Sequence, residues 1–273
     1  SGGSSIAIQD NLLYILGLLN SKVGQYYLDI SNATINYQPG DIAGIPVLEG
    51  NVEQINTLVK QNIQLSKSDW DSFETSWDFI RNPLLYSFDT IAESYLSWER
   101  ECADCFYQIK INEEELNRIF INIYGLQNEL TPEVEDNDVT VRKADLQRDI
   151  KSFLSYAVGC MFGRYSLDAE GLTYAGGKWD DNKYTTFIPD IDNCILITDE
   201  EYFGDDIVGR FVEFIKSVYS VETLEENLAF IAKALGNKGN TSREIIRNYF
   251  VKDFYKDHVK TYQKRPIYWL YDS

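Results

Sequence analysis

The residues with the clearest capacity for chemistry are the cations between positions 237 and 265. This segment holds eight basic residues against three acidic ones. Lysine and arginine form the phosphate contacts that supply most non-specific affinity for DNA. Four of the lysines recur every four residues, so on a continuous helix their ammonium groups would form one stripe along a phosphate backbone. The sequence therefore predicts a DNA-facing surface made of Lys238, Arg243, Arg247, Lys252, Lys256, Lys260 and Lys264.

The same lysines have a second interpretation as members of ordinary ion pairs on a solvated helix. Lys256 follows Asp253 by three residues, and Lys260 has the same relation to Asp257. Pairs at this spacing contribute only about 0.2 to 0.5 kcal/mol each, and Pro266 limits how far a helix can run. The chain has a formal charge of −18 and this segment carries +5, so the rest carries −23. A phosphate-binding surface and a solvated helical face both remain open.

The cysteines are candidates for a metal site, because Cys102 and Cys105 form a C-x-x-C pair. Both lie inside a helical apolar pattern, and a structural zinc ion needs two further ligands at similar spacing. Cys160 and Cys194 are isolated, and His258 is the single histidine. We expect reduced cysteines that pack in the core, with no metal.

Two acidic positions resemble the metal-binding pattern of nucleases. Asp168 is followed by Asp181-Asn182-Lys183, an acid and then an acid-x-lysine, which in such enzymes holds Mg²⁺ and assists the attacking water. That chemistry needs the second half on a buried strand, whereas residues 179–183 are a polar turn sequence. A metal-dependent nuclease is kept as an alternative.

An aromatic cluster between positions 70 and 79 could stack on nucleic-acid bases. Acidic residues alternate with the rings and would repel phosphate. We therefore expect these rings to pack in the core. The aromatic residues are Trp70, Phe73, Trp77 and Phe79, and the acidic ones are Asp69, Asp71, Glu74 and Asp78.

The composition is that of a globular protein, with 273 residues, 44% hydrophobic and 14% aromatic. No apolar run is long enough to span a membrane, and no basic region precedes the apolar stretch at 12–19, so we expect a soluble, cytoplasmic protein. Ser1–Ser5 form a Gly/Ser lead that is either native or a cloning remnant.

The elements that would position these residues are mainly helices. The segment 12–19 is apolar on nearly every side, and such a helix must be enclosed by other protein. The clearest amphipathic helix is 143–162, with apolar residues every three or four positions. Short strands are expected where apolar residues cluster between turns. Further helices are predicted at 87–110, 112–126, 206–219, 223–235 and from 241, and strands at 6–8, 45–47, 187–188, 195–197 and 267–271. The expected fold is α+β and mostly helical.

A family resemblance is carried by sequence blocks in a fixed order. The first has a leucine-rich run closed by Asn20-Ser21-Lys22, then Asn36-Tyr37, Gly40-Asp41-Ile42 and Ile45-Pro46-Val47. The order resembles the closing part of target-recognition domains in type I specificity subunits and type IIG restriction-modification enzymes. It most resembles PglX-like adenine-specific DNA methyltransferases of BREX phage-defence systems. The matching blocks are 12–23, 35–47, 69–79, 112–126, 142–150 and 265–270.

The residues that perform methyl transfer in that family are missing. Such enzymes hold the flipped adenine with an Asn/Asp-Pro-Pro-aromatic tetrapeptide, but Asn82-Pro83-Leu84-Leu85 has one proline and no aromatic residue. The glycine-rich turn that would seat S-adenosylmethionine is also absent. We therefore expect no catalytic residue and no cofactor in this chain.

The resemblance implies a two-part organisation. Residues 1–50 would be a small recognition-domain remnant with strands, and residues 51–273 a helical spacer and C-terminal region cut from a longer fold. The implied partners are double-stranded DNA and the parent's methyltransferase domain, which would use S-adenosylmethionine. The alternative is a module that docks other defence-system proteins, which suits the acidic surface.

Overall fold

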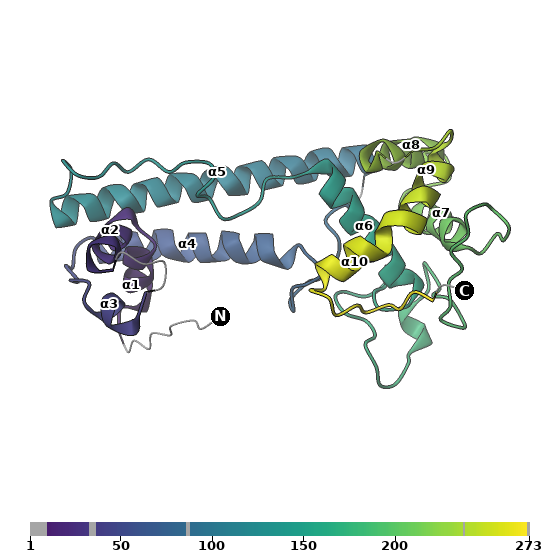
Figure 1. Cartoon of the computed structure of the whole chain (residues 1–273), viewed down its shortest axis with the longest axis horizontal. Coiled ribbons are helices and arrows are strands. Elements are labelled where there is room, and N and C mark those ends of the chain that lie inside the picture. Colours follow the sequence, from purple (N-terminus) through teal and green to yellow (C-terminus); the bar gives the residue numbers. More distant parts are fainter. Residues whose placement is uncertain (1–9, 33–36, 86–87, 237, 272–273) are drawn as a thin grey trace. The chain divides into compact units, whose positions relative to one another are not determined.

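The chain is described by a computed structural model that covers residues 10–32, 37–85, 88–236 and 238–271. It is mostly helical, and it divides into two compact units (Figure 1). Unit 1 consists of Ser1–Asp69 and Ala103–Arg142, and unit 2 of Trp70–Cys102 and Lys143–Ser273. The boundary expected near residue 50 lies inside unit 1. No described helix is both long and apolar enough to cross a membrane.

Unit 1 is built from short helices that pack on two long ones. Its core contains Tyr14 and Leu18, together with Ile55 and Phe120 from the long helices. The Tyr14 ring meets Phe120 edge to face, with ring centroids 5.4 Å apart. The helices are α1 (Leu12–Leu19), α2 (Lys22–Ser31), α3 (Pro39–Ala43), most of α4 (Val52–Asp71) and the C-terminal part of α5 (Ile91–Tyr124).

Polar contacts fix the turns of unit 1. The Ser21 hydroxyl accepts a hydrogen bond from the Gly24 amide at the start of α2, which satisfies a free helix donor. Gly24 lies so close to α1 that a Cβ there would be 2.3 Å from the Leu18 carbonyl oxygen. Only glycine allows this approach of the two helices. The Lys22 amide also donates to the Asn117 side chain on α5, at 2.9 Å.

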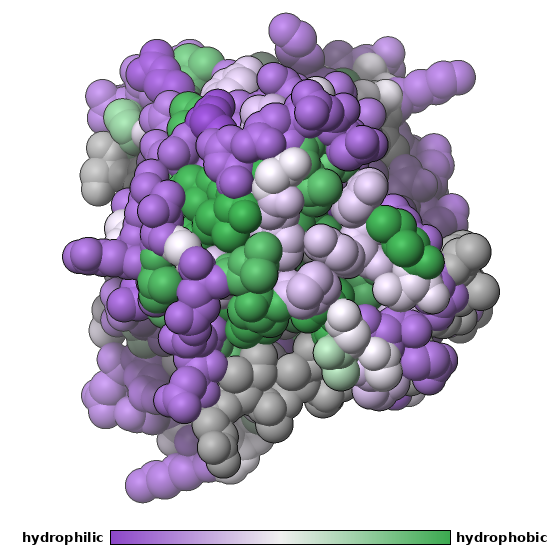
Figure 2. All heavy atoms as spheres, turned by 90° about the vertical axis from the view of Figure 1, so that its left-hand side faces the viewer, coloured by the Kyte–Doolittle hydropathy of each residue, from purple (hydrophilic) through white to green (hydrophobic). Residues whose placement is uncertain are grey.

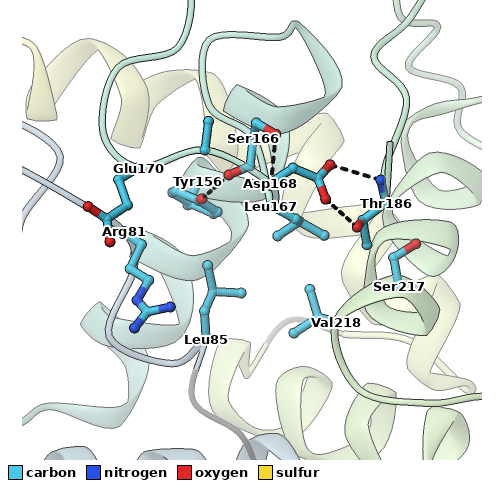
Figure 3. A pocket seen from close by; sticks show the side chains of 11 residues that line it. Arg81, Leu85, Tyr156, Ser166, Leu167, Asp168, Glu170, Thr186, Ser217 and Val218 are labelled. Atoms are coloured by element: carbon cyan, nitrogen blue, oxygen red, sulfur yellow. Dashed lines mark hydrogen bonds between the residues drawn. The ribbon is translucent and has the colours of Figure 1, made fainter. Parts of the chain in front are cut away.

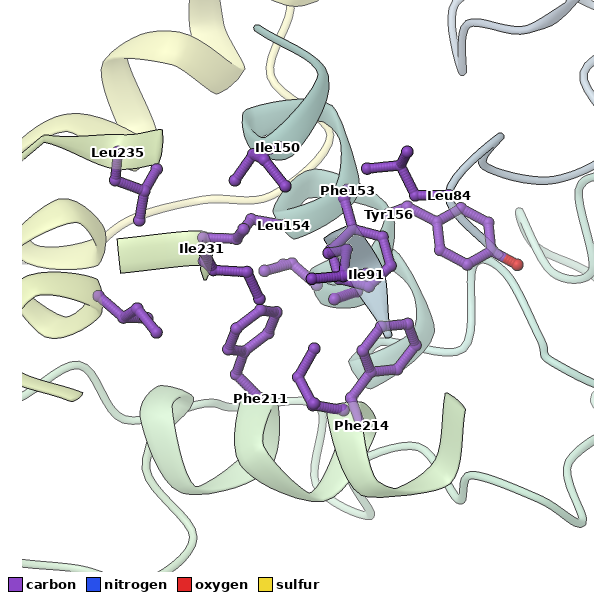
Figure 4. Close-up of a cluster of buried hydrophobic side chains, with 14 of the residues drawn as sticks. Leu84, Ile91, Ile150, Phe153, Leu154, Tyr156, Phe211, Phe214, Ile231 and Leu235 are labelled. Carbon is purple, nitrogen blue, oxygen red and sulfur yellow. The ribbon is translucent and has the colours of Figure 1, made fainter. Parts of the chain in front are cut away.

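Unit 2 surrounds α6 with shorter helices. Figure 4 shows Phe153 of α6 facing Phe211 and Phe214 of α7, while Leu154 lies toward Ile231 of α8. The side chain of Asp145 caps α6 by accepting from the Arg148 amide at 2.7 Å. The elements are the N-terminal part of α5, α6 (Leu146–Met161), η1 (Asp181–Lys183), α7 (Ile207–Val218), α8 (Leu224–Leu235), α9 (Ser242–Tyr249), the π-helical turn η2 (Phe250–Phe254) and α10 (Tyr255–Thr261).

The predicted strands are not found in the residues that the structure describes. Segments 45–47, 187–188, 195–197 and 267–271 are irregular, and 6–8 lies outside the described residues. The reason is that their backbone groups bond to helices and side chains rather than to a neighbouring strand. The carbonyl of Leu196, for example, accepts from the amide of Ile207, where α7 begins. The fold is helical with long irregular segments, and the strand-containing remnant was wrong.

The helix predictions were correct in kind, but one boundary was wrong. The helix expected at 143–162 is confirmed as α6. The helices expected at 87–110 and 112–126 form the single helix α5, which ends just before Gly125 with φ of 69°. Asn112 is therefore not a helix cap. It is buried, and its amide donates to the Asn62 side chain at 2.8 Å, so a tertiary contact satisfies it inside the helix.

Candidate nucleic-acid interface

The basic C-terminal segment forms one helical path, from α9 through the π-helical turn into α10. Thr241 caps its start by accepting from the Glu244 amide. Apolar and aromatic residues at three- and four-residue spacing bury one face in the core of unit 2. The buried residues of the path are Ile246, Arg247, Tyr249, Phe250, Phe254 and His258.

Three of the predicted lysines lie on the open side of this path. Lys252, Lys256 and Lys260 each follow a buried residue by two positions, and all three are exposed. Because two residues turn a helix through about 200°, they face away from the core. Lys264 is exposed but lies beyond the end of α10, at φ of 65°. The stripe therefore has three lysines on helix and one in the following turn.

Arg247 is a core residue rather than a surface cation. Its guanidinium donates to the Asp206 carboxylate at 2.5 Å and to the Thr198 carbonyl oxygen at 3.0 Å. The Asp206 side chain is fully buried and also caps α7. Burial alone would raise the pKa of Asp206, but the hydrogen bonds from Arg247 and Gly209 hold it below its ordinary value. The arginine thus neutralises a buried acid and ties two helices together.

The remaining predicted cations differ in how far they are paired. Arg243 makes a two-pronged contact with Glu225, with N to O distances of 2.9 and 2.6 Å. Lys256 lies 3.9 Å from Asp253, a loose pair. Lys238 is exposed in the loop that precedes α9.

Lys260 tests the ordinary ion-pair interpretation directly. Asp257 was its expected partner, but Asp257 instead binds Lys151 of α6 at 2.9 Å and accepts from the Tyr249 hydroxyl at 3.2 Å. Among the described residues, Lys260 has no carboxylate within ion-pair distance, and the same is true of Lys252 and Lys264. The ordinary ion-pair interpretation therefore holds for Lys256 only.

Sequence reasoning missed the role of the histidine. His258 is buried, and its Nε2 accepts hydrogen bonds from the amides of Ile267 and Tyr268 at 3.0 and 3.3 Å. Burial and the nearby Arg164 lower the pKa of His258 to about 4, so the ring is neutral at pH 7. His258 therefore positions the C-terminal segment and adds no positive charge.

The segment that His258 holds carries open aromatic rings. Tyr268 stacks on Phe162, with ring centroids 4.7 Å apart. Trp269 and Tyr271 are 73% and 89% exposed. The sequence signal was present as an aromatic run directly after basic residues, but it was interpreted as a strand.

The aromatic cluster at 70–79 is only partly a core element. Phe79 is buried, which confirms the expectation for that ring. Trp70 is 54% exposed and Trp77 is fully exposed, so the expectation was wrong for both. Glu74, one of the acidic residues of this stretch, is buried as well. Burial raises the pKa of Glu74 to about 7, although its hydrogen bond from Ser155 acts in the opposite direction.

A cavity of about 360 Å³ lies in unit 2 and is lined in part by Asp168, the first acid of the nuclease hypothesis. Figure 3 shows Asp168 among the lining residues, bonded to Thr186. The Asp168 carboxylate accepts from the amides of Thr185 and Thr186 and from the Thr186 hydroxyl. Burial opposes these bonds, but together they lower the pKa of Asp168 to about 2. Asp168 thus closes a loop. Because its carboxylate oxygens already accept these hydrogen bonds, few of their lone pairs remain for a metal ion.

The second half of the nuclease pattern lies in a surface turn. Asp181 accepts from the Trp179 indole at 2.7 Å, and Asp181–Lys183 form a single 3₁₀ turn. Within the described part of the chain, no three His, Cys, Asp or Glu side chains are grouped as metal ligands. The geometry does not assemble the nuclease site.

All four cysteines are free thiols. Cys102 lies in the core of unit 2, and Cys105 is half-buried in unit 1, with its sulfur 3.8 Å from the Leu65 carbonyl oxygen. Cys160 is buried in α6, and burial raises the pKa of its thiol. The core-cysteine prediction is confirmed for Cys102 and Cys160, whereas Cys194 is exposed.

Comparison with known proteins finds relatives that are much longer than this chain. No family model matches the sequence. The chain is nevertheless homologous to a segment of adenine-specific methyltransferases. It is 49% identical over 271 residues to the adenine-specific methyltransferase PglX of Lacticaseibacillus casei (strain Zhang), a match that covers 96% of this chain and 22% of PglX. It is 36% identical over 306 residues to the adenine-specific methyltransferase BrxX of Escherichia coli O9:H4 (strain HS), covering 100% of this chain and 25% of BrxX.

The predicted family resemblance is therefore confirmed along nearly the whole chain. The chain spans a quarter or less of the length of these curated relatives.

Proposed function

We propose that this chain is the DNA-recognition and positioning part of an S-adenosylmethionine-dependent adenine-N6 DNA methyltransferase of a BREX phage-defence system. The observation that carries the proposal is the 49% identity to PglX along 96% of the chain. The base-holding tetrapeptide and the cofactor turn are absent from the sequence. Methyl transfer would then belong to a part of the parent polypeptide outside this segment.

The exposed cations of the C-terminal path support contact with duplex DNA. Four lysines of this path are exposed: Lys252, Lys256, Lys260 and Lys264. The two arginines instead form ion pairs, Arg247 with Asp206 and Arg243 with Glu225. Ammonium groups on one open side suit phosphate oxygens, which position a protein on DNA without reading sequence. The open rings that follow them would add stacking contacts wherever a base leaves the duplex. The proposed DNA-facing surface is thus narrowed to these four lysines, with the exposed Lys238 of the loop before α9 as a further candidate.

A salt titration of DNA affinity in the full-length parent tests this surface. Each lost phosphate contact lowers the slope of log affinity against log salt by about 0.9. If all four lysines touch phosphate, changing them to Ala lowers the slope by about 3.6, and affinity falls for every DNA sequence alike. A matched control changes four exposed lysines elsewhere, with the same change in charge: Lys60, Lys178, Lys216 and Lys233.

The control separates local contact from overall charge. If both quadruple variants lose the same slope, the effect comes from net charge and the surface is not at the C-terminal path. If the first variant keeps its affinity and slope, the alternative gains, in which the chain docks other defence-system proteins. That alternative is favoured by the −23 charge carried outside the segment 237–265.

The cofactor assignment has its own test. Isothermal titration of S-adenosylmethionine into this chain is expected to give no binding heat, while the full-length parent binds it. Micromolar binding by the chain alone would mean that a cofactor site lies within these residues.

A further inference from the structure

The first helix of unit 1, α1, exposes apolar side chains that its sequence predicts to be buried. α1 is apolar at every position but one from Leu12 to Leu19, yet only Tyr14, Gly17 and Leu18 are buried. Leu12 is 58% exposed and Leu16 is 38% exposed. They are four residues apart, so they share one face of the helix. The expected enclosure of this helix is therefore incomplete within the described structure.

A second segment, bonded to α1, also exposes apolar side chains. The Tyr14 hydroxyl donates to the Leu48 carbonyl oxygen, and the Tyr124 hydroxyl to the Pro46 carbonyl oxygen, both at 2.5 Å. These bonds fix the segment after α3 against α1 and α5. Its side chains Val47 and Leu48 are 49% and 47% exposed. We call Leu12, Leu16, Val47 and Leu48 the apolar α1 face.

Figure 2 faces the side of the molecule on which Figure 1 draws α1, α2 and α3. There apolar side chains gather near the centre, and hydrophilic ones surround them. Exposed apolar groups that gather within a polar rim mark an interaction site more often than scattered ones do. The backbone beneath is ordered by hydrogen bonds before any partner binds, so little ordering cost remains.

The lengths of the relatives indicate what would cover the apolar α1 face. The matched segment is 22% of PglX and 25% of BrxX, so most of each enzyme lies outside it. A protein surface in the same polypeptide is present at a fixed, high local concentration. We propose that the apolar α1 face is the internal interface on which the remaining part of the methyltransferase polypeptide packs. This rests on the proposed function, because it takes the chain as a segment of such an enzyme.

Thiol labelling in the full-length parent tests the interface without DNA or cofactor. Leu12→Cys and Val47→Cys are introduced singly in a Cys194→Ser background, because Cys194 is an exposed cysteine. Labelling rates are measured in native and denatured protein, for the full-length parent and for this chain alone. Leu172→Cys, from a leucine that is 54% exposed in unit 2, reports the rate of an open site in this chain.

The expected result is that all three sites label rapidly in this chain alone. In the full-length parent, labelling at positions 12 and 47 slows by at least about tenfold, independently of protein concentration. An unchanged rate at either position overturns the proposal. Protection that disappears on dilution also overturns it, because the occupant would then be a second copy. Neither outcome depends on the lysines, so a failed DNA-binding test leaves this result interpretable.

Discussion

The helices α1 and α6 are both rich in apolar residues, but they stand in different surroundings. In α6, ten of the sixteen residues are buried, among them Asp149. In α1, three of the eight are buried. The difference does not come from hydrophobicity, since α1 has fewer polar residues than α6. It comes from the neighbours, because α6 is covered by α7, α8 and the C-terminal path, whereas α1 is covered on one side only.

The comparison shows how apolar residues in a sequence should be interpreted. They indicate which positions are buried in the whole folded protein. Where a structure leaves several such residues open on one helix, we propose an interface with another part of the polypeptide. The four predictions below test the contrast between enclosed and open positions in the two units, beginning with the largest expected effect.

Truncation of a core ring is expected to have the largest effect. Phe153 is fully buried and contacts Phe214, with ring centroids 5.6 Å apart. Phe153→Ala should lower the free energy of unfolding by about 4 kcal/mol, because it leaves a cavity in unit 2. Leu12→Ala should cost less than about 1 kcal/mol in this chain, because Leu12 is already in solvent. Chemical denaturation of both variants checks this, and equal costs would contradict the contrast between the helices.

The buried ion pair should separate two arginines that lie four residues apart. Arg247→Met leaves Asp206 as an unpaired buried charge and should cost about 3 kcal/mol. Arg243→Met breaks an exposed pair with Glu225 and should cost about 0 to 1 kcal/mol. Thermal and denaturant unfolding measure both. A similar loss in the two variants would mean that Arg247 is less enclosed than the structure shows.

Two buried groups of unit 2 should make the free energy of unfolding depend on pH in opposite directions. The pKa of Glu74 is raised to about 7, so its contribution to stability is lost as pH rises from about 4.5 through 7. The pKa of His258 is lowered to about 4, so its contribution is lost as pH falls from about 6.5 through 4. Each effect amounts to about 3 kcal/mol.

Denaturation at pH 4.5 to 7.5 distinguishes these groups. Relative to the unmodified chain, Glu74→Gln should make stability rise more steeply with pH, and His258→Gln should make it rise less steeply or fall. Parallel pH profiles for the three proteins would show that neither group titrates with a shifted pKa.

The packed side of α1 should respond to a single methyl group. Gly24→Ala is expected to cost about 1 to 2 kcal/mol, because its Cβ would overlap the Leu18 carbonyl oxygen. Gly40→Ala is the matched control, since a Cβ there meets no atom within 4 Å. Its stability should stay the same or rise slightly. If both variants unfold alike, α1 and α2 are not in tight contact.

The sequence by itself determined the local features of this protein. Apolar residues at three- and four-residue spacing fixed α6, Gly125 ended α5, and Thr241 began α9, because these signals act within one or two helical turns. The ordered sequence blocks were sufficient to identify the methyltransferase relatives. The strand predictions failed because a short apolar run specifies burial but not the neighbour with which its backbone bonds.

Only the tertiary structure decided which cations are free and which are part of the core. Arg247 and Lys252 have the same charge and lie in the same basic segment, but Arg247 meets Asp206, which is 41 residues earlier in the chain. His258 likewise has partners that spacing could not reveal, the amides of the segment that follows α10. Such pairings depend on how distant segments pack, and a carboxylate in the core attracts whichever guanidinium the fold brings to it.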